Sequence, residues 1–398
     1  MKSQTDAFRQ NTMKTLLAIY RRKEISRIEI SNQSGLTPAS VTHTVNFLLE
    51  EKQIIETGEE VRDFKGSGRS RKLLSLNATY ALVMGIEFNN KGIFLVLTDL
   101  GGSIVYKKSV KPEDYLIENI NKTIRSLIQT TLDKFEQQTI LGVGIAIPGH
   151  LDETELTLIS NNPLWRHFNL NIIKKDFDIP IIAENNIESM ALAQYLFKSE
   201  TSPERSLFIH VGPGLFCSFF DGQELKRKSN HYIGEIGHTV VDMNGPKCEC
   251  GKNGCLQTFI SDTWLINNAK FLYNNSNVST LNSLVSVAYQ INLKVIADGY
   301  QLGDSYLKHL LNTGLTLLAT SIANTLIQHD SNKIFINSEL LSYHNFKDTV
   351  VEVIKSQLNF IPTKTNLEID VLSPNVYRGA VGAAALICLI EFIGVTDY

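Results

Sequence analysis

The sequence predicts an α/β protein that carries a winged helix-turn-helix at its N-terminus. Strand-like and helical runs alternate from residue 80 onward, and a composition of 43% hydrophobic and 20% charged residues allows a large core. Before residue 80, two short helical runs joined at a glycine precede a basic loop between two strand-like runs. With 398 residues, the chain is long enough for two or three domains.

The first helices are marked by their caps. A helical run covers residues 12–22. Ser26, with a glutamate three residues later, has the form of a capping box and predicts a short helix that stops at Gly35. Thr37 and Pro38 are typical N-cap and first-turn residues of the next helix.

The helix after Thr37 has two distinct faces. Val41, Val45 and Leu48 fall at helical spacing and predict its buried stripe. The other face carries short polar side chains, namely Ser40, Thr42, His43 and Asn46. In a helix-turn-helix, the second helix enters the major groove, where such groups read base edges. An ordinary helical hairpin is the alternative that this local pattern leaves open.

The basic loop favours DNA binding over a plain hairpin. Residues 62–72 carry five basic side chains, one acidic side chain and two glycines between strand-like runs at 53–56 and 72–76, as in a wing. Such a loop contacts phosphates, and Arg69 could enter a narrow minor groove. Residues 1–76 hold 13 basic and 9 acidic side chains, although the whole chain has a net charge of −3. The expected DNA contacts are Ser26, Arg27, Thr37, Pro38, Ser40, Thr42, His43, Asn46 and Arg69.

Residues 80–398 predict an α/β body with mixed sheets. The run ILGVGIAI at residues 140–147 is apolar and ends at Pro148, which is typical of a buried strand. The other expected strands cover residues 81–87, 93–98, 181–183, 207–211, 216–220 and 333–336. The expected helices cover residues 115–135, 188–196, 310–327 and 380–393.

The sequence shows no sign of export or membrane insertion. No apolar run follows a basic start, and the apolar run at residues 380–393 is shorter than the roughly 20 residues that cross a bilayer. Five cysteines in a chain of this length do not make a disulfide framework. We expect a cytoplasmic protein in which Cys217 and Cys388 are buried core thiols.

The remaining cysteines form a compact group with one histidine. Three thiolates and an imidazole make a closed tetrahedral set, which is typical of structural zinc and leaves no open catalytic position. Gly251 and Gly254 would let the backbone wrap around an ion. Unliganded or redox-active thiols are the alternative. The expected ligands are His238, Cys248, Cys250 and Cys255.

Together these motifs resemble the ROK family of repressors, open reading frames and sugar kinases. The resemblance rests on the winged helix, Pro148-Gly149, the ENN segment at Glu184, the GEIGH segment at residues 234–238 and the cysteine spacing. It implies a two-lobed actin-like, ribonuclease-H-like ATPase fold. Members with a winged helix are similar to the xylose and N-acetylglucosamine repressors. The implied domains are a winged helix at 1–77, a small lobe at 78–185 completed by about 376–398, and a large lobe with the zinc site at 186–375.

The resemblance also implies a sugar site. In the family, the residues that correspond to Glu235, His238 and Gln257 contact sugar hydroxyls, and this chain has glutamine where the family usually has glutamate. One structural Zn²⁺ per chain would staple these segments together. The opposite wall would come from Asn185 and Asn186, which could also cap a helix, with Asn161 as a weaker candidate. The implied partners are operator DNA, a sugar or sugar derivative, and further copies of the chain in a homodimer or tetramer.

The kinase chemistry of the family is not kept in this sequence. Asn186 stands where ROK kinases have the catalytic aspartate, and an amide cannot accept the proton. The two phosphate loops are degenerate at residues 87–91 and 212–216, and Asn337-Ser338 replaces paired glycines. We therefore expect a sugar-responsive repressor of carbohydrate-utilisation genes, such as those of xylose metabolism, and not an enzyme. The alternatives are a residual ATP-dependent sugar kinase and a DNA-tethered scaffold that binds a sugar-transport protein.

Overall fold

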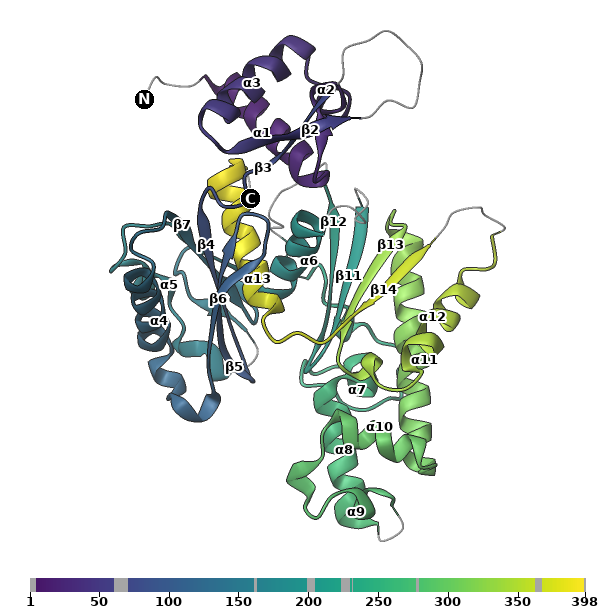
Figure 1. Ribbon diagram of the computed structural model, residues 1–398. Helices are drawn as coiled ribbons and strands as arrows, with labels where there is room; N and C mark the ends of the chain where they lie inside the picture. The colour runs from purple at the N-terminus through teal and green to yellow at the C-terminus, as the bar shows by residue number, and fades with distance from the viewer. Residues whose placement is uncertain are drawn as a thin grey trace. The chain divides into compact units, whose positions relative to one another are not determined.

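The computed structural model describes residues 5–60, 71–160, 163–198, 205–222, 230, 232–276, 279–361 and 367–396 (Figure 1). The expected DNA contact Arg69 and the expected sugar contact Asn161 lie outside these residues. The chain divides into two compact units, residues 1–202 with 224–227 and 376–398, and residues 203–223 with 228–375. The first unit includes helix α6 (Asn186–Phe197), although we expected residue 186 to begin the large lobe.

The N-terminal module is a winged helix. It contains α1 (Asp6–Arg21), α2 (Arg27–Ser34), α3 (Pro38–Glu50) and a three-stranded sheet in the order β1 (Ile25–Ser26), β3 (Arg71–Leu76), β2 (Ile54–Glu60). The capping box at Ser26 is present, and Gly35 ends α2 in the left-handed conformation with φ 69°. Thr37 caps α3 by accepting a hydrogen bond from the Ser40 amide. The local signals in the sequence therefore formed the expected helices.

The small lobe of the first unit is built on a five-stranded sheet. Its strand order is β10 (Ile181–Asn185), β7 (Ile140–Ile147), β4 (Leu82–Asn89), β5 (Gly92–Asp99), β6 (Ile104–Val110). β10, β7 and β4 run parallel, whereas β5 and β6 continue the sheet antiparallel. Alternate residues of the strands pack against α4 (Ile120–Lys134) and α5 (Leu170–Lys174).

The other face of this sheet is covered by α13 (Arg378–Ile387), which the π-helix Cys388–Ile393 continues, and α13 in turn packs against α6. A Cβ at Gly85 would lie 1.9 Å from the Ala380 carbonyl oxygen, and a Cβ at Gly144 would lie 1.9 Å from the Ala383 carbonyl oxygen. Only glycine therefore lets the helix backbone rest directly on the strands. The C-terminal segment thus completes the core of the small lobe.

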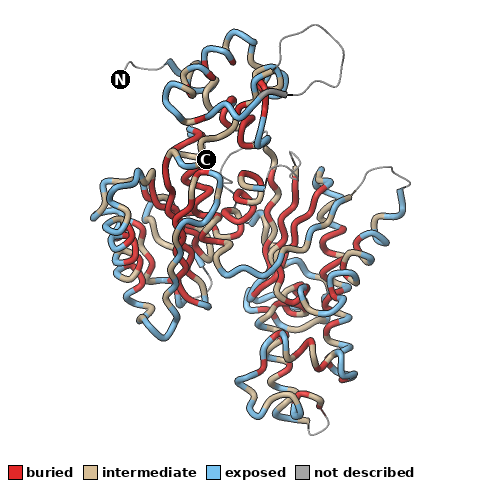
Figure 2. Tube along the Cα trace, viewed as in Figure 1, coloured by how far each residue is buried: buried red, intermediate tan, exposed pale blue. Residues whose placement is uncertain are grey.

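The second unit contains a four-stranded sheet with helices packed around it. Its strand order is β12 (Leu215–Asp221), β11 (Arg205–Val211), β13 (Lys333–Ser338), β14 (Glu368–Leu372), with only the β11–β12 pair antiparallel. Its main helices are α7 (Gln257–Ile260), α8 (Asp262–Asn275), α9 (Leu281–Leu284), α10 (Leu293–Gln301), α11 (Ser305–Gln328) and α12 (Phe346–Gln357). Buried residues follow the strands of both sheets (Figure 2).

Helix α11 is long and apolar enough to cross a membrane by length and composition alone. Its apolar stripe, however, forms part of the core of the second unit, with Leu307, Leu311, Leu315, Leu318 and Ile322 at most 1% exposed. α11 is therefore a core helix of this unit.

The structure departs from the sequence expectations in a few places. β6 was not predicted, because most of its residues are exposed or half-buried at the sheet edge and its run IVYKKSV contains two lysines. β14 was also missed, and its residues are likewise half-exposed. Cys388 is buried as expected, but the expectation for Cys217 was wrong, since this side chain is only partly buried against the core.

The winged helix packs against the small lobe through the end of α1. The Tyr20 hydroxyl donates a 2.8 Å hydrogen bond to the Leu100 carbonyl, and the Tyr20 ring meets the Phe392 ring edge-on at 6.3 Å. The Arg21 guanidinium lies 6.0 Å from the centroid of the Tyr195 ring on α6. Tyr20 is 7% exposed, so its side chain in this junction is largely shielded from solvent. The winged helix is therefore anchored to both α6 and the C-terminal segment.

Replacing Tyr20 with phenylalanine should weaken this junction. Tyr20→Phe keeps the ring but leaves the buried Leu100 carbonyl without its donor, which costs about 1–2 kcal/mol. The free energy of unfolding, measured by urea titration, should fall by this amount. Tyr80→Phe is the control, because Tyr80 meets the same Phe392 ring at 5.9 Å. Equal losses in the two variants would show that the Tyr20 hydroxyl contributes nothing specific.

Candidate functional site

The expected metal ligands come together in the second unit. The ligand atoms of His238, Cys248, Cys250 and Cys255 all lie within 4.8 Å of one another. Cys248 Sγ is 3.6 Å from His238 Nδ1, and Cys250 Sγ is 3.6 Å from Cys255 Sγ. Tetrahedral zinc with its usual bond lengths separates such ligands by about 3.6–3.8 Å. A disulfide needs about 2.05 Å, so the cluster fits a metal ion rather than a disulfide.

The chemistry of the donor set also fits a cation. Burial, followed by the neighbouring Cys250 and Cys248 thiols, raises the pKa of Cys255 to about 12. Three thiolates can share this space only if a positive ion compensates their charge. The backbone is shaped for the cluster as well, because Gly254 has φ 67° and a Cβ there would lie 1.5 Å from the Asp242 carbonyl oxygen. The four residues are therefore consistent with the zinc-binding motif of ROK proteins.

Gln257 lies next to this cluster at the start of α7. Its Nε2 lies 3.4 Å from Cys248 Sγ and 3.1 Å from a Glu249 carboxylate oxygen, and donates to both. A glutamate at this position would bring a negative charge to the sulfur and could not donate to it. The glutamine would thus support Cys248 as a thiolate ligand if the cluster holds a metal ion, a role that the resemblance to the family did not suggest.

The other expected sugar contacts of the second unit lie on the GEIGH segment. Residues 236–238 form one 3₁₀ turn, in which the His238 amide donates to the Glu235 carbonyl at 3.0 Å. This turn places the half-buried Glu235 one turn before the metal ligand His238. An added Cβ at Gly237 would lie 3.0 Å from Gln257 Oε1. Gln257 is therefore adjacent to the segment that carries Glu235 and His238.

Asn185 and Asn186 take different roles in the first unit. Asn185 caps α6, since its Oδ1 accepts from the amides of Ile187 and Glu188 at 2.8 and 3.2 Å, and its Nδ2 donates to the Gly149 carbonyl at 2.9 Å. Asn185 is only 5% exposed, so the structure places it as the N-cap of α6. Asn186 is half-buried, and its Nδ2 donates to Glu87 at 3.4 Å.

Glu87 is a buried carboxylate beside Asn186. It lies on β4, is 2% exposed, and accepts hydrogen bonds from Asn186, Asn89 and the Gly379 amide. Burial raises the pKa of Glu87 to about 7, although these three hydrogen bonds and Lys91 favour its charged form. The sequence placed Glu87 in a degenerate phosphate loop but gave no sign of this burial.

The segments of the second unit that we expected to be degenerate nucleotide loops contain contacts among the protein's own side chains. His210 Nδ1 lies 3.0 Å from Asn337 Nδ2, and a Cβ at Gly212 would lie 2.5 Å from His210 Nε2. His210 therefore fills the space between the 212–216 turn and Asn337. This histidine was missed because a lone histidine in a strand carries no functional pattern.

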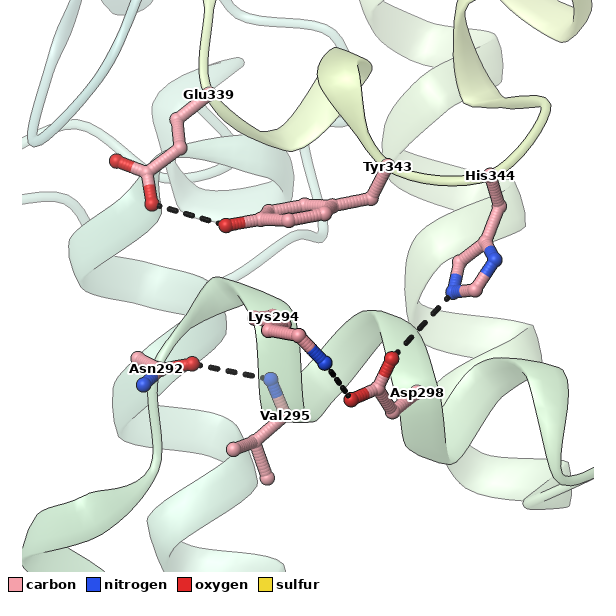
Figure 3. A network of polar contacts seen from close by, with 7 residues as sticks. All are labelled: Asn292, Lys294, Val295, Asp298, Glu339, Tyr343 and His344. Carbon is pink, nitrogen blue, oxygen red and sulfur yellow. Dashed lines mark hydrogen bonds and ion pairs between the residues drawn. The ribbon is translucent and has the colours of Figure 1, made fainter.

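A polar network follows Asn337 along the chain (Figure 3). The Tyr343 hydroxyl donates to Glu339 at 3.2 Å, and burial together with Glu339 raises the pKa of this hydroxyl. On α10, Lys294 pairs with Asp298 at 2.6 Å, and His344 lies 3.8 Å from the same carboxylate. These contacts connect α10 to the loop before α12.

The expected DNA contacts differ in how accessible they are. Thr42, His43 and Asn46 are exposed on α3, and the His43 ring meets the Phe8 ring at 5.1 Å. Thr37, Pro38, Ser40 and Arg27 are exposed or half-buried around them. The expectation for Ser26 is corrected, because this residue is 2% exposed and its hydroxyl is held by Glu29 in the capping box. Ser26 therefore orients α2 and does not face solvent.

The pH dependence of the free energy of unfolding should reveal the raised pKa of Glu87. Because its pKa is raised from about 4.5 to about 7 in the folded protein, its contribution is fully present below about pH 4.5 and is lost as the pH rises through 7. Glu87→Gln removes the ionisation. From pH 5 to pH 8, the free energy of unfolding of the wild type should therefore fall by about 2–3 kcal/mol relative to this variant.

Guanidinium titrations at both pH values measure this difference. Glu118→Gln, which changes an exposed carboxylate, is the control and should alter the pH dependence by less than about 0.5 kcal/mol. A constant difference between wild type and Glu87→Gln across this range would contradict the raised pKa.

Comparison with known proteins identifies the family. The ROK family model matches residues 83–389. The xylose repressor of Bacillus subtilis is 26% identical over 311 residues, which cover 73% of this chain and 79% of that protein. The DNA-binding transcriptional dual regulator NagC of Escherichia coli is 22% identical over 374 residues, which cover 91% of this chain and 88% of NagC.

Solved structures show the same fold. A ROK family transcriptional regulator described as a homolog of the E. coli MLC protein aligns with a TM-score of 0.77 at 21% identity, over 98% of this chain and 97% of that one. A ROK family glucokinase from Streptomyces griseus aligns with a TM-score of 0.63 at 22% identity, over 77% of this chain. The chain therefore belongs to the ROK family, and its sequence is similar to those of the xylose repressors and NagC.

Proposed function

We propose that this protein represses carbohydrate-utilisation genes by binding operator DNA through its winged helix, and that a sugar changes this binding. The observation that carries the proposal is the combination of an exposed polar face on α3 with a ROK body in which His210 and Asn337 fill the former nucleotide loops. The DNA contacts would come from Thr42, His43 and Asn46, with Arg69 of the wing.

The proposed sugar contacts are Glu235, His238 and Gln257 in the second unit, and Asn186 with Asn161 in the first. Carboxylate, imidazole and amide groups recognise hydroxyls when a rigid frame holds them. The similarity to the xylose repressors makes a xylose-like pentose the first candidate, and the similarity to NagC makes an N-acetylated amino sugar the second. The capping role of Asn185 argues against it as a direct contact.

A structural zinc ion would hold the GEIGH segment and the start of α7 together. His238, Cys248, Cys250 and Cys255 would bind it as a closed tetrahedral set, with one ion per chain. The ion would supply cross-linking and charge compensation only. The protein itself already joins the two segments through Gln257, which donates to Cys248 and lies beside Gly237. The cysteine-bearing loop and the GEIGH segment are therefore packed against the same side chain.

Helix α6 offers a direct connection from the sugar contacts to the DNA-binding module. Asn186 is its first residue, and Tyr195 near its other end meets Arg21 of α1. Twelve helical residues span about 18 Å and move as a rigid element. A sugar that displaces Asn186 would therefore shift α1 and the recognition helix behind it. In a homodimer or tetramer, this shift would change the half-site spacing that two winged helices reach.

The contacts of the nucleotide side argue against the kinase alternative. Asn186 cannot act as a general base, because an amide does not accept the proton, and its Nδ2 already donates to the buried Glu87 carboxylate. Pro213 also lacks a backbone donor in the turn that would hold phosphates. We propose that residues 78–398 bind a ligand without catalysing a reaction on it. The scaffold alternative, in which the body binds a sugar-transport protein, is tested together with the sugar.

DNA binding and its response to sugar can be tested by fluorescence anisotropy. Labelled DNA from upstream of the gene should bind the full chain at fixed, stated salt, and one member of a panel of pentoses, hexoses, amino sugars and their phosphates should change the affinity. Thr42→Glu adds a negative charge to the exposed face of α3 and should weaken binding at least tenfold.

Thr130→Glu is the matched control, because Thr130 is also exposed and also bonds its i−4 carbonyl on a helix. This variant should bind DNA as the wild type does. Binding without any response to the sugars would favour the scaffold alternative. Equal binding to random DNA, unaffected by Thr42→Glu, would refute the proposed DNA interface.

The metal proposal predicts one zinc per chain in the purified protein. Cys250→Ser removes a ligand on the exposed side of the cluster and should lower the zinc content measured by atomic emission. Cleavage by trypsin after Lys247 or Lys252, inside the loop, should become at least tenfold faster. Cys217→Ser, which changes a cysteine outside the cluster, should alter neither value. A zinc-free wild type that resists trypsin equally well would contradict the role of the metal.

A further inference from the structure

We propose that Arg27 fixes the base preference of the recognition helix by holding Asn46 as a hydrogen-bond donor, so that Asn46 selects guanine over adenine. This inference rests on the proposed DNA-binding function and adds to it a specificity-determining residue. It concerns the pair formed by the first residue of α2 and an exposed residue of α3.

The guanidinium of Arg27 is anchored to α3 at two points. Its Nη1 donates to Asn46 Oδ1 at 3.0 Å and lies 3.4 Å from the Thr42 carbonyl oxygen, one helical turn earlier. Arg27 is half-buried, whereas Asn46 and Thr42 are exposed on the face expected to meet DNA. The arginine therefore bridges the two helices of the helix-turn-helix at the edge of the recognition surface.

This contact decides which way the Asn46 amide faces. A guanidinium has five N–H donors and no acceptor, so only the amide oxygen of asparagine can face it. The opposite orientation would set N–H groups against N–H groups. The Asn46 Oδ1 consequently faces the positive guanidinium and has one lone pair engaged within the protein, which makes Nδ2 the group best placed to meet a base.

An asparagine whose amide oxygen faces an arginine recognises bases differently from an asparagine whose amide has no protein partner. Asparagine recognises adenine by accepting from N6 and donating to N7 at the same time, which needs both ends of the amide. Guanine instead presents two acceptors, N7 and O6, and matches an NH₂ group. Arg27 uses one of the two lone pairs of Oδ1 and sets its positive charge beside the other, so the N6 donor of adenine meets a weakened acceptor and a like partial charge. The N7 and O6 acceptors of guanine meet only donors, so the contact to guanine is not weakened.

The charges around the pair favour the same base. The positive guanidinium lies next to the amide, where the electronegative O6 and N7 edge of guanine would approach. The carboxylate of Glu29, which lies on the same short helix, is occupied by the Ser26 amide and hydroxyl at 2.9 and 2.7 Å. It is therefore held in the cap and does not compete for the guanidinium.

Selection from a random DNA library tests the proposal with the full-length protein. The wild type should enrich guanine at one position of its motif, and Asn46→Ala should lose the preference at that position alone. Arg27→Ala frees Oδ1, so the preference at the same position should move toward adenine by roughly tenfold. Arg22→Ala also removes one positive charge from the module, at an exposed residue, and should leave the motif unchanged.

A second measurement isolates the contact itself. Replacing the selected guanine with 7-deazaguanine removes N7 and should weaken binding of the wild type severalfold, but not binding of Asn46→Ala. Adenine at the Asn46-dependent position of the wild-type motif, or an unchanged preference in Arg27→Ala, would overturn the proposal. A wild type that enriches no motif would refute the DNA-binding function, and this inference with it.

Discussion

The contact of α13 with the small-lobe sheet supports the rest of the first unit. Gly85 and Gly144 allow the helix backbone to touch the strands, and the C-terminal segment then contacts α6 on one side and Tyr20 of the winged helix beyond it. The last part of the chain thus completes the core and anchors the DNA-binding module. Because α13 packs closely on the sheet and on α6, and α1 contacts both α6 and the C-terminal segment, we expect a shift of one of these helices to be passed on to the others.

Glu87 is the polar centre of this packing. Its carboxylate accepts from the backbone amide of Gly379 in the first turn of α13 and from the side-chain amide of Asn186 in the first turn of α6, so the starts of two helices are tied to one buried acid. An added Cβ at Gly379 would lie 2.2 Å from this carboxylate, which leaves no room for water there. A ligand that draws the Asn186 amide away must therefore leave a buried charge less well satisfied, which couples ligand binding to the packing of both helices.

Local signals made the winged helix and the metal cluster predictable from the sequence. The capping box at Ser26, the Thr37-Pro38 start and the cysteine spacing each act within a few residues, and each formed as expected. The edge strand β6 was missed because its residues are exposed or half-buried, so its sequence does not show the apolar pattern by which a buried strand is recognised. The contacts of Glu87 with Asn186, of His210 with Asn337 and of Arg27 with Asn46 join residues far apart in the sequence, so no local pattern could reveal them.

The same distant contacts explain how a kinase-like body can serve as a binding domain. Phosphoryl transfer needs a free carboxylate beside the nucleophile and open loops for phosphates. Here the acid beside Asn186 is Glu87, which is buried and already accepts hydrogen bonds from three donors. The space next to Gly212 is taken by the His210 ring. Asn186 and Asn337 are each held by a hydrogen bond within the protein, and side chains held in this way can pass the displacement of a helix to a neighbouring element.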